Sequence, residues 1–228
     1  MTTRRRLYLM RHGEVAYFDA EGKPLPEEGV GLTEEGRAQA GAAAELLAPI
    51  HIDRVITSGL RRTVETAAIV APGLEAELWP ELRELRGSKL SAIPEAELKD
   101  QFVHVFRGVV PLERRFLGGE TIGELFDRVL PAVHRQLADE GWDTVLAVLH
   151  GGVNRAILSW ALTGERLYLG PFEQAAGCIN VLDVGSDGVW IVRAVNHSPL
   201  DPAHTETRLT VMERYWEEYR EGQTPEGV

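Results

Sequence analysis

The sequence predicts an α/β fold built on a mainly parallel sheet, and three observations support this. Short apolar runs able to form buried strands occur at 7–10 and 145–149, and a short β-branched run occurs at 53–57. Each run is followed along the chain by a segment with helical features. Strands that alternate with helices are typical of a parallel sheet covered by helices.

The helical segments carry start and stop signals. Thr33, Ser58 and Thr121 each stand where a helix N-cap is expected, and Gly164 stands where a helix ends. Near the C-terminus, residues 178–184 and 189–195 are predicted to form two strands joined by a hairpin-like turn.

We expect a single domain over residues 1–228, because no internal repeat or low-complexity linker interrupts the chain. Residues 88–119 have scattered charges and are predicted to be an insertion or lid that covers one side of the sheet. The tail from about residue 222 is predicted to be flexible. The last helix has one apolar stripe, which fits docking on the core or, as the alternative, a homodimer interface; the stripe consists of Leu209, Met212, Trp216 and Tyr219.

Charge and cysteine content restrict the environment and the partners. The formal net charge of −11 argues against nucleic acid or an acidic membrane surface as a partner. No stretch is long enough to span a bilayer. The single cysteine, Cys178, has apolar neighbours and is predicted to be a buried, unreactive side chain. A cytoplasmic location is the prediction.

Two strand ends carry the residues most suited to chemistry. The run at 7–10 ends in Arg11, His12 and Gly13, and the run at 145–149 ends in His150 and Gly151. Ligands of open α/β sheets bind at the carboxyl ends of strands. Arginine offers a planar fork that fits phosphate, histidine can attack or shuttle protons, and glycine lets a backbone approach closely. These residues predict an anion-handling active site.

The helix expected after Ser58 has Arg61 and Arg62 in its first turn, where the helix dipole disfavours cations. One of the two arginines is therefore predicted to serve an anion bound at the helix N-terminus.

Other chemistries have no sequence support. Metal-binding, nucleophile-elbow and Walker motifs are absent, so we expect neither a metal nor a cofactor. The remaining histidines are predicted to be ordinary surface or core residues; they are His51, His104, His134, His197 and His204.

Residues 9–14, which contain Arg11-His12-Gly13, resemble the RHG signature of the histidine phosphatase superfamily, the phosphoglycerate-mutase-like group. Further stretches resemble this family's motifs in the family's order. They are the helix start at 32–40, the arginine segment at 57–67, the LxE at 82–84, the GGES-like turn at 118–121 and the second-histidine motif at 148–156.

The resemblance implies a three-layer α/β/α sandwich and phosphoryl transfer through a phosphohistidine. It makes His12 the nucleophile and Glu84 the proton donor. The residues expected to grip the phosphoryl group are Arg11, Arg62, His150 and the backbone of Gly151. Supporting positions are expected at Gly13, Glu14 and Ser58.

The predicted function is a metal-independent phosphomonoesterase that acts on a small phosphorylated metabolite, of the histidine acid phosphatase type. The glycine pair at 151–152 favours phosphatase-like members, whereas Arg114-Arg115 resembles a carboxylate-binding pair of mutases. A cofactor-dependent phosphoglycerate mutase is the alternative, and a non-catalytic phosphate-binding module is the second. Val15 and Phe18 replace polar residues common in the family, so the substrate stays open.

Overall fold

The computed structural model describes residues 4–19 and 23–223, and it contains a six-stranded sheet. The strand order is β3-β2-β5-β1-β7-β8. The strands are β1 (Arg4–Arg11), β2 (Arg54–Thr57), β3 (Ala76–Leu78), β5 (Thr144–Leu149), β7 (Ile179–Gly185) and β8 (Trp190–His197). Within the described ranges, no helix has both the length and the apolar composition needed to cross a membrane.

The sheet is parallel through its first four strands and antiparallel at one edge. β1 pairs in parallel with β5, and β5 with β2, whereas β7 runs antiparallel to both β1 and β8. The antiparallel edge is the expected hairpin. Because β1 and β5 are parallel neighbours with Arg11 opposite Leu149, the residues that follow them emerge side by side.

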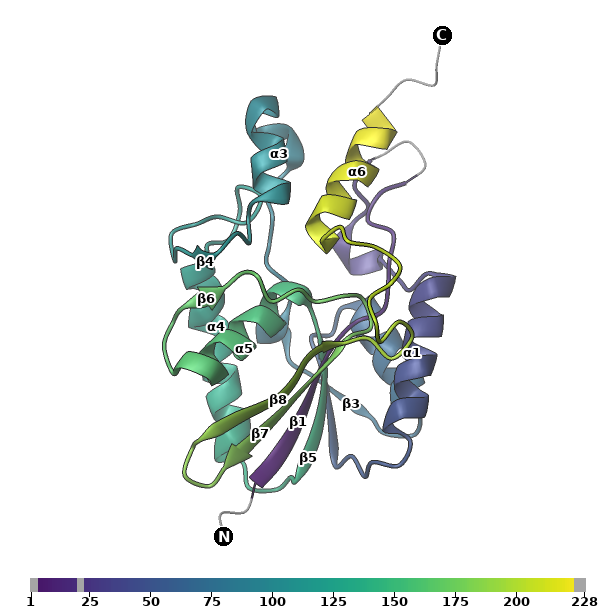
Figure 1. Cartoon of the computed structure of the whole chain (residues 1–228), viewed down its shortest axis with the longest axis vertical. Helices are drawn as coiled ribbons and strands as arrows, with labels where there is room; N and C mark the ends of the chain where they lie inside the picture. Colours follow the sequence, from purple (N-terminus) through teal and green to yellow (C-terminus); the bar gives the residue numbers. More distant parts are fainter. Residues whose placement is uncertain (1–3, 20–22, 224–228) are drawn as a thin grey trace.

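Helices cover both faces of the sheet, which gives the expected three layers (Figure 1). One face packs against α4 (Ile122–Ala138) and α5 (Gly151–Thr163), and the other against α1 (Glu34–Leu47) and α2 (Arg61–Val70). The alternation of β1 explains this division, since Leu7 and Leu9 join the first core and Tyr8 and Met10 the second.

A third group of elements lies beyond the carboxyl end of the parallel strands, at the top of Figure 1. It contains α3 (Glu95–Val103) and α6 (Val211–Gln223), which pack together through an aromatic cluster that includes Phe102 and Trp216. Two short strands, β4 (Val109–Val110) and β6 (Tyr168–Leu169), pair nearby. The remaining elements are single 3-10 turns at Glu27–Gly29, Pro80–Leu82 and Leu90–Ala92.

The predicted helix ends and the buried cysteine are present in the structure, with one exception. Thr33 and Thr121 cap their helices, and Gly164 ends α5 in the left-handed conformation, as expected. Cys178 is fully buried, and burial raises the pKa of its thiol to about 12. The prediction that Ser58 caps the following helix is wrong, because α2 begins at Arg61 with Leu60 at its N-cap.

The C-terminal helix also departs from expectation. α6 continues through Gly222 to Gln223, so the helix reaches further than predicted, and the rest of the predicted tail lies outside the described residues. Met212 and Trp216 pack against α3, in agreement with docking on the protein itself, whereas Leu209 precedes the helix and is exposed. The single-domain boundary and the insertion at 88–119 stay predictions.

Candidate active site

Two buried histidines meet where β1 and β5 end. His12 directly follows β1 and His150 directly follows β5, and the backbone N–H of His12 donates to the carbonyl of Leu149 at 3.0 Å. Their ring centroids lie 5.2 Å apart, and both side chains are almost fully buried. The parallel pairing of two strands distant in sequence therefore creates this pair.

His12 is held in one orientation by its own loop. Its Nδ1 lies 2.7 Å from the carbonyl oxygen of Gly13, so Nδ1 carries the proton and donates it. Gly13 itself packs so closely on the backbone of Gly36, at the start of α1, that it has no room for a side chain, and the backbone of Glu14 leaves none at Gly36. Burial, reinforced by the positive charges of Arg62 and Arg11, lowers the pKa of His12 well below its usual value. The ring is therefore neutral, with a lone pair on Nε2.

His150 is held by a chain of hydroxyl groups. Its Nε2 lies 2.7 Å from Ser58 Oγ, which lies 3.1 Å from Thr63 Oγ1, and Thr63 donates to the carbonyl of Leu60 at 2.7 Å. Ser58 therefore orients the histidine, although it does not cap α2. Burial, followed by the charge of Arg62, lowers the pKa of His150 as well.

Two buried arginines lie beside the histidines, and each has an N–H donor without a hydrogen-bond partner among the described residues. Arg11 donates to the carbonyl of Gln174 and to the hydroxyl of Tyr215, and Arg62 donates to the carbonyl and the carboxylate of Glu27. Among the described side chains, Nε of Arg11, Nε of Arg62 and Nδ1 of His150 are buried without a hydrogen-bond partner. Buried polar atoms are normally satisfied, so three such nitrogens together indicate a site for an acceptor-rich ligand.

The two arginines at the start of α2 have different environments, as the argument from the helix dipole predicts. Arg62 is 1% exposed and faces the histidines, whereas Arg61 lies on the surface and pairs with Glu65 at 2.7 Å. Only the buried member of the pair belongs to the site.

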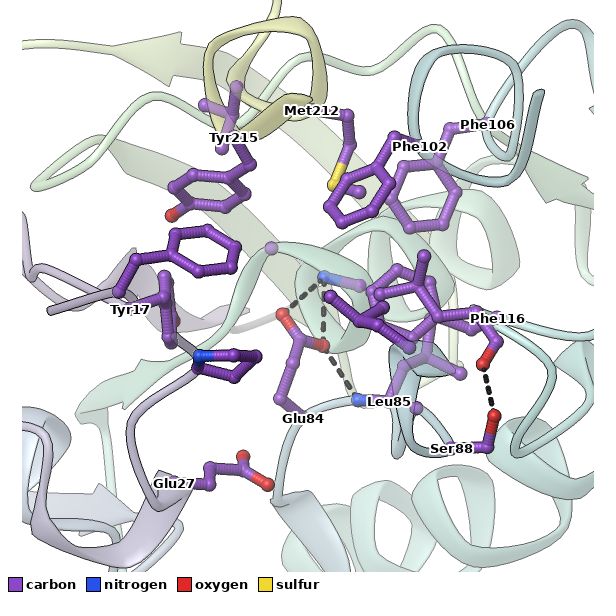
Figure 2. Close-up of a pocket in the computed structure, with 18 of the residues that line it drawn as sticks. Tyr17, Glu27, Glu84, Leu85, Ser88, Phe102, Phe106, Phe116, Met212 and Tyr215 are labelled. Atoms are coloured by element: carbon purple, nitrogen blue, oxygen red, sulfur yellow. Dashed lines mark hydrogen bonds between the residues drawn. The ribbon is translucent and has the colours of Figure 1, made fainter. Parts of the chain in front are cut away.

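Glu84 faces the same space from the segment after β3 (Figure 2). Its two carboxylate oxygens accept from the backbone N–H of Gly152 at 3.1 and 3.0 Å, and one of them accepts from Leu85 at 2.9 Å. A Cβ atom at position 152 would lie 2.6 Å from Glu84 Oε1. The second glycine after His150 therefore makes room for Glu84, while Gly151 is the first residue of α5 and lines the same cavity.

Glu14 is not among the described residues that line the cavity. Its carboxylate accepts from Thr33 Oγ1 at 3.0 Å, and its backbone N–H donates to Gln39, so it connects the loop after β1 with α1.

Several residues of the site carry no signal in the sequence. Tyr17 and Glu27 come from the loop between β1 and α1, and Tyr215 comes from α6; all three line the cavity beside Arg11 and Arg62. Arg128 is another such residue. It donates to the carbonyls of residues 81, 83 and 84 and pairs with Glu120 at 2.7 Å, so it fixes the segment that carries Glu84.

Replacing Arg128 with alanine is expected to lower the free energy of unfolding by about 3 kcal/mol, because the buried Glu120 carboxylate then keeps only the backbone N–H of Arg86 and a longer, exposed ion pair with that arginine. Burial alone would raise the pKa of Glu120, but the hydrogen bond and charge of Arg128 hold this pKa below its usual value. Denaturant unfolding measures the change. Arg135→Ala is the control, because Arg135 lies on the same helix and makes an exposed pair with Glu81. Equal losses in the two variants would contradict the role given to Arg128.

The arginine pair that resembles a mutase feature lies elsewhere. Arg114 pairs with Asp100 at 2.8 Å, and Arg115 donates to the carbonyl of Gly119 at 2.7 Å. Neither is among the described residues that line the cavity.

Fold and site together define an α/β protein with a buried cationic site, at the ends of parallel strands, suited to a tetrahedral oxyanion. The sequence model of the histidine phosphatase superfamily (branch 1) matches residues 7–197, and the chain belongs to that superfamily.

Named relatives include phosphatases, a phosphoglycerate mutase-like protein and probable phosphoglycerate mutases. The chain is 28% identical over 211 residues to a probable 2-carboxy-D-arabinitol-1-phosphatase of Arabidopsis thaliana, covering 88% of this chain but 43% of that protein. It is 29% identical over 204 residues to an adenosylcobalamin/alpha-ribazole phosphatase of Salmonella typhimurium, covering 84% of this chain and 96% of that one. Among solved structures, a mycobacterial glucosyl-3-phosphoglycerate phosphatase with inorganic phosphate superimposes with a TM-score of 0.66 at 25% identity, over 86% of this chain and 98% of that one.

Proposed function

We propose that this protein is a metal-independent phosphomonoesterase that hydrolyses a small phosphorylated metabolite through a phosphohistidine. One observation carries the proposal. The neutral ring of His12 donates its Nδ1 proton to the carbonyl of Gly13. It lies near three buried nitrogens that lack a hydrogen-bond partner among the described residues.

In the first half of the reaction, the lone pair on Nε2 of His12 attacks phosphorus in line, and the bond from phosphorus to the ester oxygen breaks. Glu84, protonated at this stage, gives its proton to the leaving oxygen. Arg11, Arg62 and Nδ1 of His150 hold the phosphoryl oxygens as charge builds on them. Phosphoryl transfer depends mainly on positioning and on electrostatic stabilisation, so such a clamp supplies most of the effect.

In the second half, water attacks the phosphohistidine and transfers a proton to the Glu84 carboxylate, and the bond between phosphorus and His12 breaks. Neutral His12, protonated Glu84 and inorganic phosphate are regenerated. Bound phosphate favours a proton on Nδ1 of His150, since its negative charge opposes the two arginines.

Two features favour hydrolysis over the mutase alternative. The relatives that match 88% and 84% of this chain are named phosphatases, whereas a mutase-like relative matches 70% of it and a probable mutase 64%. Arg114 and Arg115 are engaged by Asp100 and Gly119, away from the cavity, so the pair that suggested a mutase has other partners. The homodimer and the cytoplasmic location stay predictions.

The proposal is tested by phosphate release from a panel of small phosphomonoesters in the presence of EDTA, together with isomerisation of 3-phosphoglycerate. Rapid quenching in base followed by mass spectrometry tests for phosphate on the peptide that contains His12. We expect EDTA-resistant release and a phosphorylated His12 peptide. Isomerisation faster than release would identify a mutase, and phosphate binding without turnover or phosphoenzyme would identify the non-catalytic module.

Replacing Glu84 with glutamine is expected to slow hydrolysis of alkyl phosphates by about 10²–10⁴-fold, because the leaving alkoxide then lacks a proton donor. Hydrolysis of p-nitrophenyl phosphate should fall much less at the phosphorylation step, because its leaving group needs no proton. Single-turnover kinetics on both esters measure the difference. The control is Glu81→Gln, three residues away at an exposed pair with Arg135. A loss independent of the leaving group would contradict the assignment.

A further inference from the structure

The cavity beside Arg11, Arg62 and Glu84 is small and has two chemically different ends. Its volume is about 270 Å³, just below the roughly 300–1,000 Å³ common for ligand pockets. Arg11, Arg62 and Glu84 lie at the end where the phosphoryl group would be held. The rest of the wall comes from the loop between β1 and α1, the 88–119 segment and α6. These parts surround whatever alcohol the phosphate is attached to.

The wall of this second end is apolar. Figure 2 shows Phe102, Phe106 and Phe116 on the side of the cavity opposite Tyr17, with Met212 beside Phe102. Phe106 and Phe116 stack with their centroids 5.8 Å apart, and Phe102 and Met212 are at least 92% buried in the cluster that joins α3 and α6. Phe18, from the loop between β1 and α1, also lines the cavity.

Ser88 and Arg155, the polar side chains on this side of the cavity, are already engaged. Tyr17 and Tyr215 lie on the opposite side (Figure 2). Ser88 donates to the carbonyl of Leu117 at 2.9 Å. Arg155, the remaining cation among the described lining residues, pairs with Glu173, donates to the carbonyl of Gly170 and lies over the ring of Phe106. A sugar hydroxyl or a second anionic group that entered this end would lose water and gain few hydrogen bonds in exchange.

We infer that the substrate is the phosphate monoester of a compact apolar alcohol, such as an alkyl or ring alcohol, rather than a sugar phosphate or a phosphorylated hydroxy acid. This inference rests on the proposed function, because it assigns the occupant of the cavity that opens from the proposed phosphate site. Each methylene group buried against the wall is expected to raise kcat/KM by about fourfold.

Two esters of the same shape test the inference. Cyclohexylmethyl phosphate and glucose 6-phosphate both carry a phosphate on a methylene attached to a six-membered ring, and they differ mainly in the polarity of that ring. We expect kcat/KM for cyclohexylmethyl phosphate to exceed that for glucose 6-phosphate by 10²-fold or more. Equal rates, or a preference for the sugar, would overturn the inference and leave the phosphatase proposal standing.

A wall variant tests the location. Met212→Asn is expected to reduce kcat/KM for cyclohexylmethyl phosphate about tenfold, with little change in competitive inhibition by inorganic phosphate, and Met212→Leu should retain the wild-type preference. The control Leu46→Asn changes an exposed residue of α1 and should leave both esters unaffected. An unchanged preference in a folded Met212→Asn protein would overturn the assignment of this wall.

Failure of the proposed function is distinguishable from failure of this inference. Were neither ester hydrolysed and no phosphohistidine formed, calorimetry with the two intact esters would still compare their binding. Tighter binding of cyclohexylmethyl phosphate would support the apolar site without catalysis, and equal or weaker binding would overturn it.

Discussion

Replacing His12 with alanine is expected to reduce phosphate release by roughly 10⁴–10⁶-fold, the loss that follows removal of a nucleophile from a group of residues acting together. The variant should also form no phosphoenzyme, while it keeps the fold and still binds inorganic phosphate through Arg11 and Arg62. Stopped assays of phosphate release and mass spectrometry of the quenched protein measure both effects.

The matched control is His51→Ala. His51 is exposed and makes a surface pair with Asp53, so its replacement should leave turnover within about twofold of wild type. A His12→Ala protein that retained phosphoenzyme formation would place the nucleophile elsewhere.

The environment of His12 adds a pH prediction. Because burial and the two neighbouring arginines lower its pKa below the ordinary value of 6.5, neutral His12 persists as the solution is acidified past that value. Protonation would remove the lone pair on Nε2, so the loss of activity caused by His12 should begin well below pH 6.5. Titration of the histidine ring signals by NMR, with His12→Ala used to identify the His12 signal, checks the direction directly. A His12 that titrated at or above 6.5 would contradict the described burial and charge.

The second large effect is expected at Arg62. Its guanidinium has two groups of donors, one now held by Glu27 and one, Nε, without a described partner, and both would be available to a phosphoryl group that displaces Glu27. Arg62→Ala should lower kcat/KM by about 10³-fold or more, because preorganised charged donors stabilise the transition state strongly in a buried site. Arg62→Lys should recover only part of this loss, since lysine keeps the charge but lacks the planar fork.

Arg61→Ala is the adjacent control. It removes the same side chain from the next residue, but Arg61 is exposed and paired with Glu65 at i,i+4, an interaction worth about 0.3–0.5 kcal/mol. In steady-state kinetics, Arg61→Ala should therefore keep nearly the wild-type kcat/KM, and the two variants should differ by almost the full loss expected for Arg62→Ala. Similar losses in the two variants would contradict the division of the arginine pair.

Much of the architecture is local in origin and could be read from the sequence. Periodicity and capping residues predicted the strands, the start of α1 at Thr33 and the capping box at Thr121, because these depend on contacts within a few residues. The strand-end histidines could be recognised for a similar reason, since an apolar run that stops at a histidine and a glycine already marks the end of a buried strand.

The sequence also identified which residue types could handle an anion, and the dipole argument indicated that one arginine at 61–62 has a ligand role. It could not choose between them from local chemistry alone, and the family motif made that choice. The structure agrees, because helix geometry points adjacent side chains in different directions, here one into the core and one into solvent.

Only the tertiary structure decided the rest. Ser58 looked like a helix cap, yet the pairing of β5 with β2 brings it to His150, 92 residues away in sequence. Arg128 and Glu120 fix Glu84 through contacts 8 to 47 residues apart. The apolar end of the cavity arises because α6 packs against α3, an arrangement set by burial of aromatic side chains from distant segments. Local patterns determined the elements and the reactive residues. Long-range packing determined how those residues are oriented and what kind of cavity wall they face, because side-chain burial depends on the whole fold.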